Sequence, residues 1–244
     1  MHRLEQESAY ILHTRAYRET SLLLEIFTRE HGRISVVARG VRGTNKRIHT
    51  RKQALLQPFV PLFISASGRG ELLTLKECDS SALPHALLGK RLITGFYLNE
   101  LLIRLLHRTD PHIQLFDDYQ KTLVQLELPP PGGGSDSLHE QKVLRLFEKN
   151  LLTALGYAPE LSKDVESGDP IDPDKFYFFD PEKGPTIANA IVTSQSIFKG
   201  KSLLCLASNQ FEDASVLQEI KRLMRQTLAK YLGNKPLESR RLFI

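Results

Sequence analysis

The sequence predicts an α+β protein, in which a small five-stranded β-barrel is followed by an α-helical domain. Two patterns carry this prediction. Up to residue 80, short apolar runs rich in β-branched and aromatic residues are separated by glycine-containing turns, as in a small barrel. From Pro84 onward, apolar residues recur with the 3.6-residue period of a helix. Hydrophobic residues make up 41% of the 244 residues, which is enough for a packed core.

Five strands are expected within residues 1–80. Their ranges are 8–15, 21–28, 33–41, 56–65 and 71–79. Gly32 suits a tight turn before the third strand, because glycine adopts a positive φ without strain. Pro58 and Pro61 cannot donate ladder hydrogen bonds, which places the fourth strand at an edge or a bend. Five short strands match the OB-fold, a common platform for nucleic acids, and fit an SH3-like barrel almost as well.

Residues 81–244 are predicted to form the helical domain. Its expected helices are 87–106, 111–126, 136–155, a short one at 195–206 and a long amphipathic one at 213–232. Asp110 is the expected N-cap of the second helix, because Pro111 suits the first helical position. Residues 129–135 (PPPGGGS) read as a linker. Residues 157–187 are acidic and are predicted to be irregular.

No catalytic constellation stands out in the sequence. It lacks the glycine-rich phosphate loops and the G-x-S-x-G motif, and its eight histidines show no paired metal-ligand spacing. The acidic run from Asp164 to Asp174 is the candidate metal site, but Pro170 and Pro173 break the ligand spacing of a calcium loop. A solvated loop or a contact with a basic partner is the alternative. We therefore expect no enzyme activity, no metal and no cofactor.

The cysteines and the N-terminal residues bear on location. Cys78 and Cys205 lie far apart and form no C-x-x-C pair, which favours a reducing cytoplasm. The first residues contain no apolar run typical of a signal peptide. No segment approaches the length of a membrane span. A cytoplasmic protein is expected.

Positive charge is concentrated between Glu30 and Glu71, although the net charge of the whole chain is only +5. No acid occurs in this interval, and the basic residues are the candidate DNA-binding residues Arg33, Arg39, Arg42, Lys46, Arg47, Arg51, Lys52 and Arg69. Most are arginines, whose planar guanidinium suits phosphate. A barrel is expected to hold this loop beside Arg69. The pattern predicts a polyanion-binding surface, with a merely solvated face as the alternative.

Two aromatic residues of the barrel segment are candidates for stacking on bases. They are Tyr17 and Phe27, since barrel faces often provide such rings. A residue such as Phe27 packs in a protein core more often than it stacks on a base.

A series of short motifs runs in order along nearly the whole chain. They are LHTRAYRETSLLL from Leu12, FTREHGR from Phe27, VARG from Val37, LQPF from Leu56, GRGE from Gly68, LTL from Leu73, YLNELL from Tyr97, LRLFE from Leu144, LGY from Leu155 and YLGNKPLESR from Tyr231. On these motifs the chain resembles the RecO family of bacterial DNA-repair mediators. The resemblance implies an OB-fold barrel, a helical domain, binding of single- and double-stranded DNA, and annealing of complementary strands without ATP.

The resemblance also implies protein partners. They are the acidic C-terminal tail of the single-stranded-DNA-binding protein (SSB), RecR and, in some pathways, RecF, with RecA loaded on SSB-coated gaps. The SSB tail ends in a phenylalanine, so its receptor needs an apolar slot and a cation. By analogy with the family, Arg145 is the expected cation, near the apolar faces that contain Phe116 and Tyr119. An exposed arginine that pairs with Glu148 on the same helix is the alternative.

One departure from the family concerns zinc. Some members carry four cysteines that form a zinc site after the third helix, whereas residues 157–187 contain no cysteine. Zinc is therefore not expected here.

The expected function is that of a non-enzymatic mediator of DNA repair, associated with the nucleoid. Two alternatives remain open. An RNA-binding OB-fold protein would prefer RNA to DNA of identical sequence, because only RNA offers the 2′-hydroxyl. A scaffold whose basic loop meets an acidic protein would show no affinity for nucleic acid at moderate salt.

Overall fold

The computed structural model describes residues 2–42, 53–188, 195–211, 213–239 and 241. The chain forms two compact units. The first unit consists of Met1–Leu128 together with Pro236–Ile244, and the second of Pro129–Lys235. No described helix is long and apolar enough to cross a membrane.

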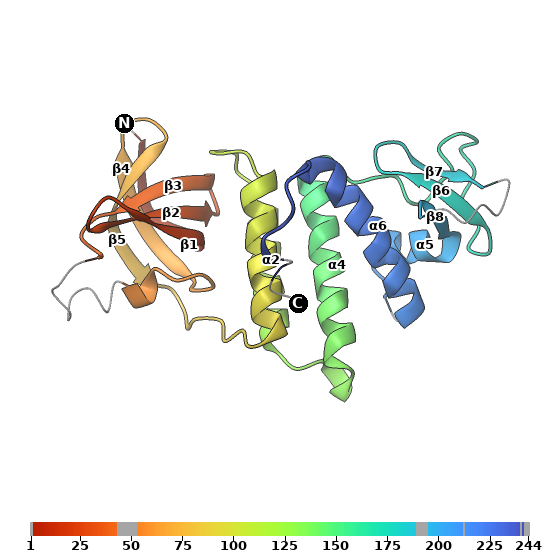
Figure 1. Cartoon of the computed structure of the whole chain (residues 1–244), viewed down its shortest axis with the longest axis horizontal. Coiled ribbons are helices and arrows are strands. Elements are labelled where there is room, and N and C mark those ends of the chain that lie inside the picture. The colour runs from red at the N-terminus through yellow and green to blue at the C-terminus, as the bar shows by residue number, and fades with distance from the viewer. Residues whose placement is uncertain (1, 43–52, 189–194, 212, 240, 242–244) are drawn as a thin grey trace. The chain divides into compact units, whose positions relative to one another are not determined.

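The first unit contains a closed five-stranded barrel (Figure 1). Its strands are β1 (His2–Tyr17), β2 (Ser21–Thr28), β3 (Gly32–Ala38), β4 (Leu62–Gly68) and β5 (Leu72–Ser80). The order around the barrel is β1-β2-β3-β5-β4, and β1 closes it by pairing with both β2 and β4. All pairs are antiparallel except β3 with β5. The predicted α+β class with an N-terminal OB-fold barrel is confirmed.

The interior of the barrel follows from the alternation of each strand. Leu24 and Ile26 of β2 lie two residues apart and are buried. They pair directly with Val36 and Ile34 of β3, which are buried too. Strand β1 is longer than predicted, because it runs past two irregularities in its ladders, between Leu4 and Glu7 and between Ile11 and His13. Such bulges bend a strand, so β1 can curve around the barrel and pair with β2 on one side and β4 on the other.

Two helices pack on the outer side of the barrel within the first unit. They are α2 (Lys90–Leu105) and α3 (Ile113–Glu127). The ring of Phe116 on α3 lies with its centroid 5.6 Å from that of Tyr10 on β1 and 5.4 Å from that of Phe27 on β2. Asn99 on α2 donates from Nδ2 to the carbonyl oxygen of Leu12 at 3.0 Å.

The packing of these helices differs from two sequence-based expectations. The predicted boundary after residue 80 follows the change in secondary structure, whereas α2 and α3 belong to the same compact unit as the barrel. The expected N-cap at Asp110 is wrong. Helix α3 begins at Ile113, with His112 in the N-cap position and no side-chain cap. The loop before it packs closely on the β2–β3 turn, since a Cβ on Gly32 would lie 1.9 Å from the carbonyl oxygen of Asp110.

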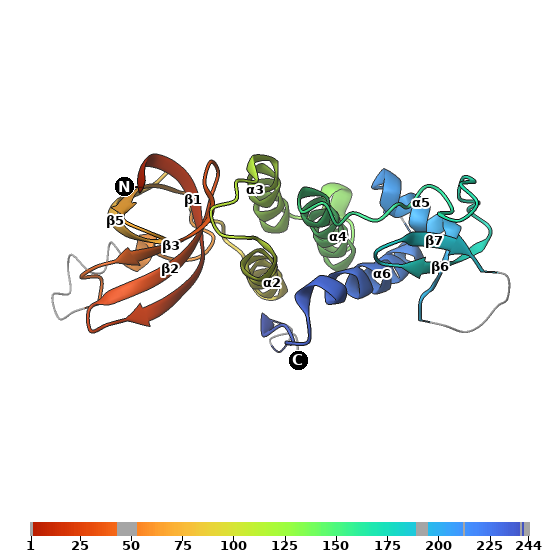
Figure 2. The ribbon, with the colours of Figure 1, turned by 90° about the horizontal axis from the view of Figure 1, so that it is seen from above.

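The second unit combines helices with a small sheet (Figure 2). Its elements are the 3-10 turn η1 (Pro131–Gly133), α4 (Asp136–Ala154), β6 (Phe176–Asp180), β7 (Gly184–Ile187), β8 (Ile197–Lys199), α5 (Gly200–Ser208) and α6 (Ala214–Leu232). Helix α6 packs against α4 and α5, and α5 packs against β8. The three strands form a sheet in the order β7-β6-β8.

This sheet corrects the prediction for the acidic region. Residues 157–187 are not wholly irregular, because β6 and β7 lie within them, and the expected helix at 195–206 begins only at Gly200, after β8. The prolines and acids around β6 concealed the strand signal in the aromatic run FYFF that starts at Phe176.

The acids of this region shape its turns. One oxygen of Asp164 accepts hydrogen bonds from the backbone amides of Glu166 and Ser167, and the other accepts from the amide of Ile187 at 2.7 Å. The hydrogen bond from the Ser167 amide, with those from Glu166 and Ile187, outweighs burial and lowers the pKa of Asp164. Within the described ranges, no three His, Cys, Asp or Glu residues are grouped so as to hold a metal ion.

A carboxylate on α2 holds the C-terminal segment within the first unit. Glu100 accepts hydrogen bonds from the backbone amides of Glu238 and Ser239, each at 2.8 Å, and from the hydroxyl of Ser239 at 2.6 Å. Burial opposes ionisation of this carboxylate, but these hydrogen bonds and nearby Arg104 outweigh it and lower the pKa of Glu100. A lowered pKa in the folded state stabilises the fold at neutral pH.

The replacement Glu100→Gln is expected to cost about 1–2 kcal/mol at pH 7, because it weakens hydrogen bonds to a charged acceptor. The contribution of Glu100 is fully present above the unfolded pKa of about 4.3 and is lost as the pH falls through the lower folded value. The difference between wild type and variant should therefore shrink between pH 5 and pH 3. Urea unfolding at several pH values measures it. Glu71→Gln, an exposed change, is the control, and a pH-independent difference would contradict this account.

Candidate nucleic-acid interface

The segment that leaves β3 holds two arginines outside the barrel. Val41 is buried in the barrel core, and the backbone amide of Arg42 donates to the carbonyl oxygen of Thr20 at 2.8 Å. Gly40, which stands between Arg39 and Val41, has a φ of +63°, a conformation that glycine adopts without strain. The backbone is thus anchored on both sides while the side chains of Arg39 and Arg42 are exposed.

Two further arginines lie at the same end of the barrel. Strand pairing places Arg15 opposite Leu23, which itself pairs with Val37 near the end of β3. Arg18 lies in the β1–β2 turn, with its guanidinium carbon 5.4 Å from the centroid of the Tyr17 ring. Sequence reasoning missed both, because only strand pairing brings the β1–β2 turn to the end of β3. We call these four residues, Arg15, Arg18, Arg39 and Arg42, the arginine end of the barrel.

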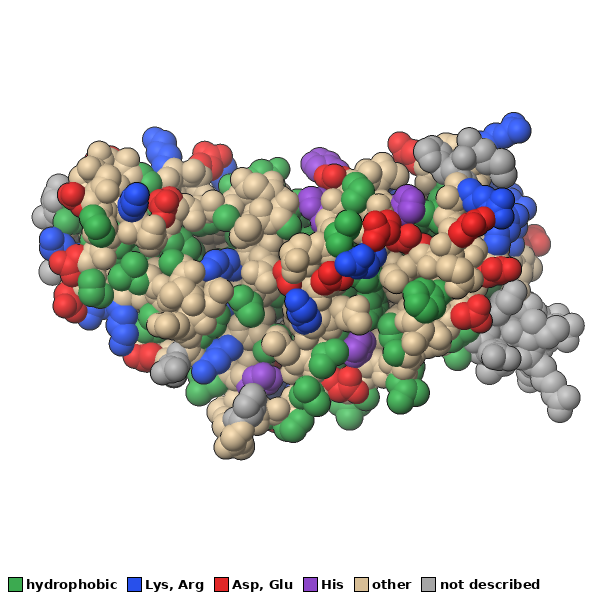
Figure 3. Space-filling model, turned by 180° about the vertical axis from the view of Figure 1, so that it is seen from behind, with side chains coloured by type: hydrophobic (Ala, Val, Ile, Leu, Met, Phe, Trp, Pro, Cys, Tyr) green, Lys and Arg blue, Asp and Glu red, His purple; other side chains and the backbone are tan. Residues whose placement is uncertain are grey.

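An acid, Glu19, follows Arg18 in the β1–β2 turn. None of the four side chains of the arginine end forms an ion pair with an acid in the part of the chain that the structure describes. All four are exposed. On the face shown in Figure 3, Lys and Arg side chains gather over the barrel at the right of the view, with some acids among them. Exposed guanidinium groups that form no ion pair suit the phosphates of a nucleic acid.

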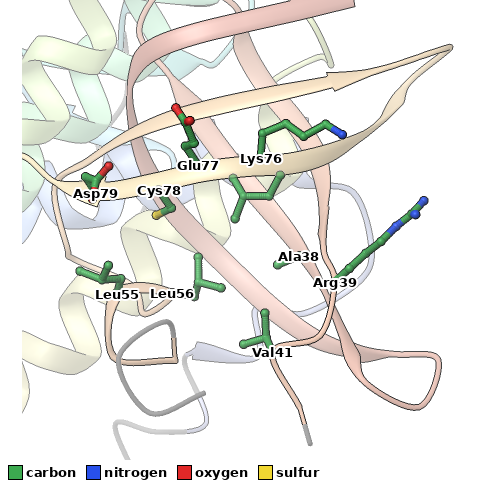
Figure 4. Close-up of a pocket in the computed structure, with 10 residues that line it drawn as sticks. Ala38, Arg39, Val41, Leu55, Leu56, Lys76, Glu77, Cys78 and Asp79 are labelled. Atoms are coloured by element: carbon green, nitrogen blue, oxygen red, sulfur yellow. The ribbon is translucent and has the colours of Figure 1, made fainter. Parts of the chain in front are cut away.

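A pocket of about 270 Å³ opens beside Arg39. Its lining combines apolar side chains, among them Val41, Leu55 and Leu56, with charged ones. Figure 4 shows Arg39 and Lys76 extending to the same side of this pocket, with Cys78 directed between the strands. The pocket is thus lined by two cations, Arg39 and Lys76, and by two acids, Glu77 and Asp79.

Arg69 lies elsewhere on the barrel. It is in the β4–β5 turn, just before Leu72, which pairs with Ser35 in the parallel ladder. Arg39 follows four residues after Ser35, roughly 13 Å further along the strand direction. Arg69 therefore does not lie beside Arg39, and the rest of the basic loop, 43–52, is outside the described residues.

Arg33 is committed to contacts within the first unit. Its guanidinium donates to a carboxylate oxygen of Glu25 at 3.1 Å and to the carbonyl oxygen of Leu106 at 3.1 Å. Only 13% of its side chain is exposed. Arg33 thus ties β3 to the end of α2 and offers little surface to a phosphate. Lys46, Arg47, Arg51 and Lys52 lie outside the described residues.

The aromatic candidates differ in exposure. Phe27 is fully buried against Phe116 and Tyr119, so it is a core residue and not a stacking platform. Tyr17 is half-buried beside Arg18 at the arginine end.

The residues expected to receive an SSB tail are buried as well. Phe116 and Tyr119 lie in the core of the first unit, and the hydroxyl of Tyr119 donates to Oδ1 of Asn99 at 2.6 Å. Arg145 lies on α4 in the second unit, 2.8 Å from the carboxylate of Glu148. Both members of this ion pair are buried, with side-chain exposures of 7% and 0%. Arg145 thus pairs with Glu148, as the alternative expected, but the pair is buried and not exposed.

An OB-fold barrel whose end carries exposed arginines is typical of the class of proteins that bind nucleic acids. Comparison with known protein families identifies the family to which the chain belongs. Residues 1–83 match the family described as "Recombination protein O N terminal", and residues 89–241 match "Recombination protein O C terminal". The chain belongs to the RecO family of DNA repair and recombination proteins.

Similar proteins agree over almost their whole length. "DNA repair protein RecO" of Coxiella burnetii (strain RSA 331 / Henzerling II) is 45% identical over 242 residues, which cover 98% of each chain. The protein of the same name from Nitrosococcus oceani is 42% identical and that from Azoarcus sp. (strain BH72) is 40% identical. These matches cover 98% of this chain and 93% and 95% of the respective relatives.

Proposed function

We propose that the protein binds single- and double-stranded DNA through the arginine end of its barrel and anneals complementary strands without ATP. The observation that carries this proposal is the set of four exposed arginines without a described acidic partner at one end of an OB-fold. Contacts of this kind neutralise phosphates and release counterions irrespective of base sequence. A surface of this kind suits a protein that must hold any two complementary strands.

The proposal extends to a role without catalysis and to protein partners. Membership of the RecO family supports binding to the acidic SSB tail and to RecR, an indirect link to RecF, and help in loading RecA on SSB-coated DNA at the nucleoid. Arg145, Phe116 and Tyr119 are poor candidates for the SSB receptor in the folded state, because all three are buried. The receptor is therefore proposed without assigned residues.

The replacement of Arg15, Arg18, Arg39 and Arg42 by glutamine is expected to weaken binding to single-stranded DNA and to reduce its salt dependence. Each lost phosphate contact flattens the slope of log K against log salt by about 0.7 on single strands, so four contacts account for nearly 3 units. Fluorescence anisotropy of a labelled oligonucleotide over a salt series measures both quantities.

A charge-matched control removes four cations elsewhere, at Lys90, Lys121, Lys142 and Lys163. This variant has the same net charge and should keep the wild-type slope. If both variants lose slope equally, binding depends on overall charge and not on the arginine end. Binding of RNA of the same sequence tests the RNA-binding alternative, because only RNA has 2′-hydroxyl groups. If the protein binds no nucleic acid at moderate salt, the alternative of a protein–protein scaffold is favoured.

A further inference from the structure

The small sheet of the second unit exposes two phenylalanines side by side. Phe176 and Phe178 are alternate residues of β6, and 44% and 45% of their surfaces are exposed. Tyr177 and Phe179, the other alternate pair, are 3% and 1% exposed. Alternate residues of a strand point to the same face, so both exposed rings stand on the outer face of the sheet.

The strand register defines what surrounds these rings. Phe176 lies directly opposite Lys199 of β8, and Phe178 lies opposite Ile197 of β8 and Thr186 of β7. Residues paired in this way lie on the same face, with Cβ atoms about 4.5–5.5 Å apart. Lys199 forms no ion pair with any acid among the described residues. The outer face is therefore an aromatic strip with an unpaired cation beside its first ring.

The inner face fixes the position of the strand. The ring of Phe179 packs edge-on against that of Phe198, with 5.9 Å between centroids. The guanidinium carbon of Arg222 lies 4.4 Å from the centroid of Phe198, and Arg222 donates to the carbonyl oxygen of Ile197. The hydroxyl of Tyr177 accepts a hydrogen bond from the amide of Asp172 at 2.9 Å. The exposed rings thus stand on a strand that is already ordered.

Three of the acids near the sheet make contacts within the second unit. The carboxylate of Asp172 lies 3.6 Å from Nζ of Lys175, and that of Asp180 accepts hydrogen bonds from two backbone amides in the turn after β6. Glu182 pairs with Lys230 at 3.1 Å. The ion pairs offset the charges of Asp172 and Glu182, whereas the hydrogen bonds lower the pKa of Asp180 and keep it negatively charged.

The size and spacing of the strip favour nucleobases over a protein surface. Two half-exposed rings supply far less area than the ~800 Å² per partner of a stable protein interface. Residues two apart on a strand are separated by about 6.7 Å, which is twice the 3.4 Å spacing of stacked bases. Each ring can therefore hold one base, or both rings can enclose one. Every base has a π-face, so such contacts tolerate any sequence.

We propose that Phe176 and Phe178 form a stacking platform for the bases of single-stranded DNA, with Lys199 beside it as a phosphate contact. This inference rests on the proposed function, since it assigns a second contact to a protein that binds single strands through its arginine end. The two contacts differ in how strongly their affinity depends on salt. The arginine end contributes salt-dependent affinity for phosphates, whereas the platform contributes affinity for bases that depends little on salt.

The double variant F176L/F178L removes the aromatic faces and keeps apolar side chains. We expect affinity for a labelled oligothymidine to fall at least about fivefold for each ring, with the salt slope unchanged. The control F176Y/F178Y keeps both rings and should bind like the wild type. On an abasic strand of equal length, wild type and F176L/F178L should bind equally. Matching thermal unfolding midpoints establish that the variants are folded.

A cross-linking experiment tests the wild type directly. A single strand that contains 5-bromodeoxyuridine is irradiated with the protein, and the adduct is located by mass spectrometry. An adduct within the tryptic peptide 176–183 is expected. Adducts confined to barrel peptides, or equal binding of the oligothymidine by wild type and F176L/F178L, would overturn the platform and leave the arginine end intact. If the wild type binds no single strand, the proposed function fails and the platform fails with it.

Discussion

Replacement of Phe116 by alanine is expected to lower the free energy of unfolding of the first unit by about 3–5 kcal/mol. The side chain is 2% exposed, and its ring packs against those of Tyr10 and Phe27. Its loss leaves a cavity between α3 and the outer side of β1 and β2. Urea unfolding, followed by hydrogen exchange of β1 peptides, measures the effect on this unit.

A change on the exposed side of the same helix is the control. Val124→Ala removes two methyl groups from a side chain that is 41% exposed, and should change stability by less than about 0.5 kcal/mol. If Phe116→Ala instead leaves the unfolding midpoint unchanged and weakens binding of an acidic peptide ending in phenylalanine, then Phe116 is a receptor residue and not a core residue.

Replacement of Arg145 by alanine is expected to destabilise the second unit by about 3–5 kcal/mol. The reason is that Glu148, which is fully buried, would lose the cation that lies 2.8 Å from it. Removing one member of a buried ion pair costs stability because the other charge keeps its desolvation penalty and loses the attraction that offset it. Urea unfolding of the intact protein, with hydrogen exchange of α4 peptides, measures the loss.

A double replacement separates charge from packing. Arg145→Met with Glu148→Leu removes both charges and keeps apolar volume, so it should lose less stability than Arg145→Ala alone. Lys142→Ala, a change at the more exposed side of α4, should have little effect. Unchanged stability of Arg145→Ala together with weaker binding of the acidic peptide would restore Arg145 as the cation of a receptor.

Much of the fold was predictable because it depends on local patterns. The predicted strand 21–28 coincides with β2, and the predicted helices 136–155 and 213–232 differ from α4 and α6 by one residue. In each, apolar periodicity extends over the whole element. The misses lie where the pattern is short or interrupted, as in β6, where five residues stand between runs of acids and prolines.

The candidate interface was predictable only in part. Charge segregation can be counted along the chain, so Arg39 and Arg42 were recognised. Arg15 and Arg18 carry no such signal, since their neighbours in sequence are Glu19 and uncharged residues. Arg33 lies in the same basic interval, yet the ion pair with Glu25 commits it to the fold.

The sequence by itself determined the succession of strands and helices, the membership of the RecO family, and the concentration of positive charge before Glu71, because each of these is written in neighbouring residues. Only the tertiary structure decided which side chains remain available to a partner. Helical periodicity gives Phe116 an apolar face without saying what covers it, and here the outer side of the barrel does. Alternation likewise puts Phe176 and Phe178 on one face, but which face of β6 stays exposed depends on where its neighbours pack.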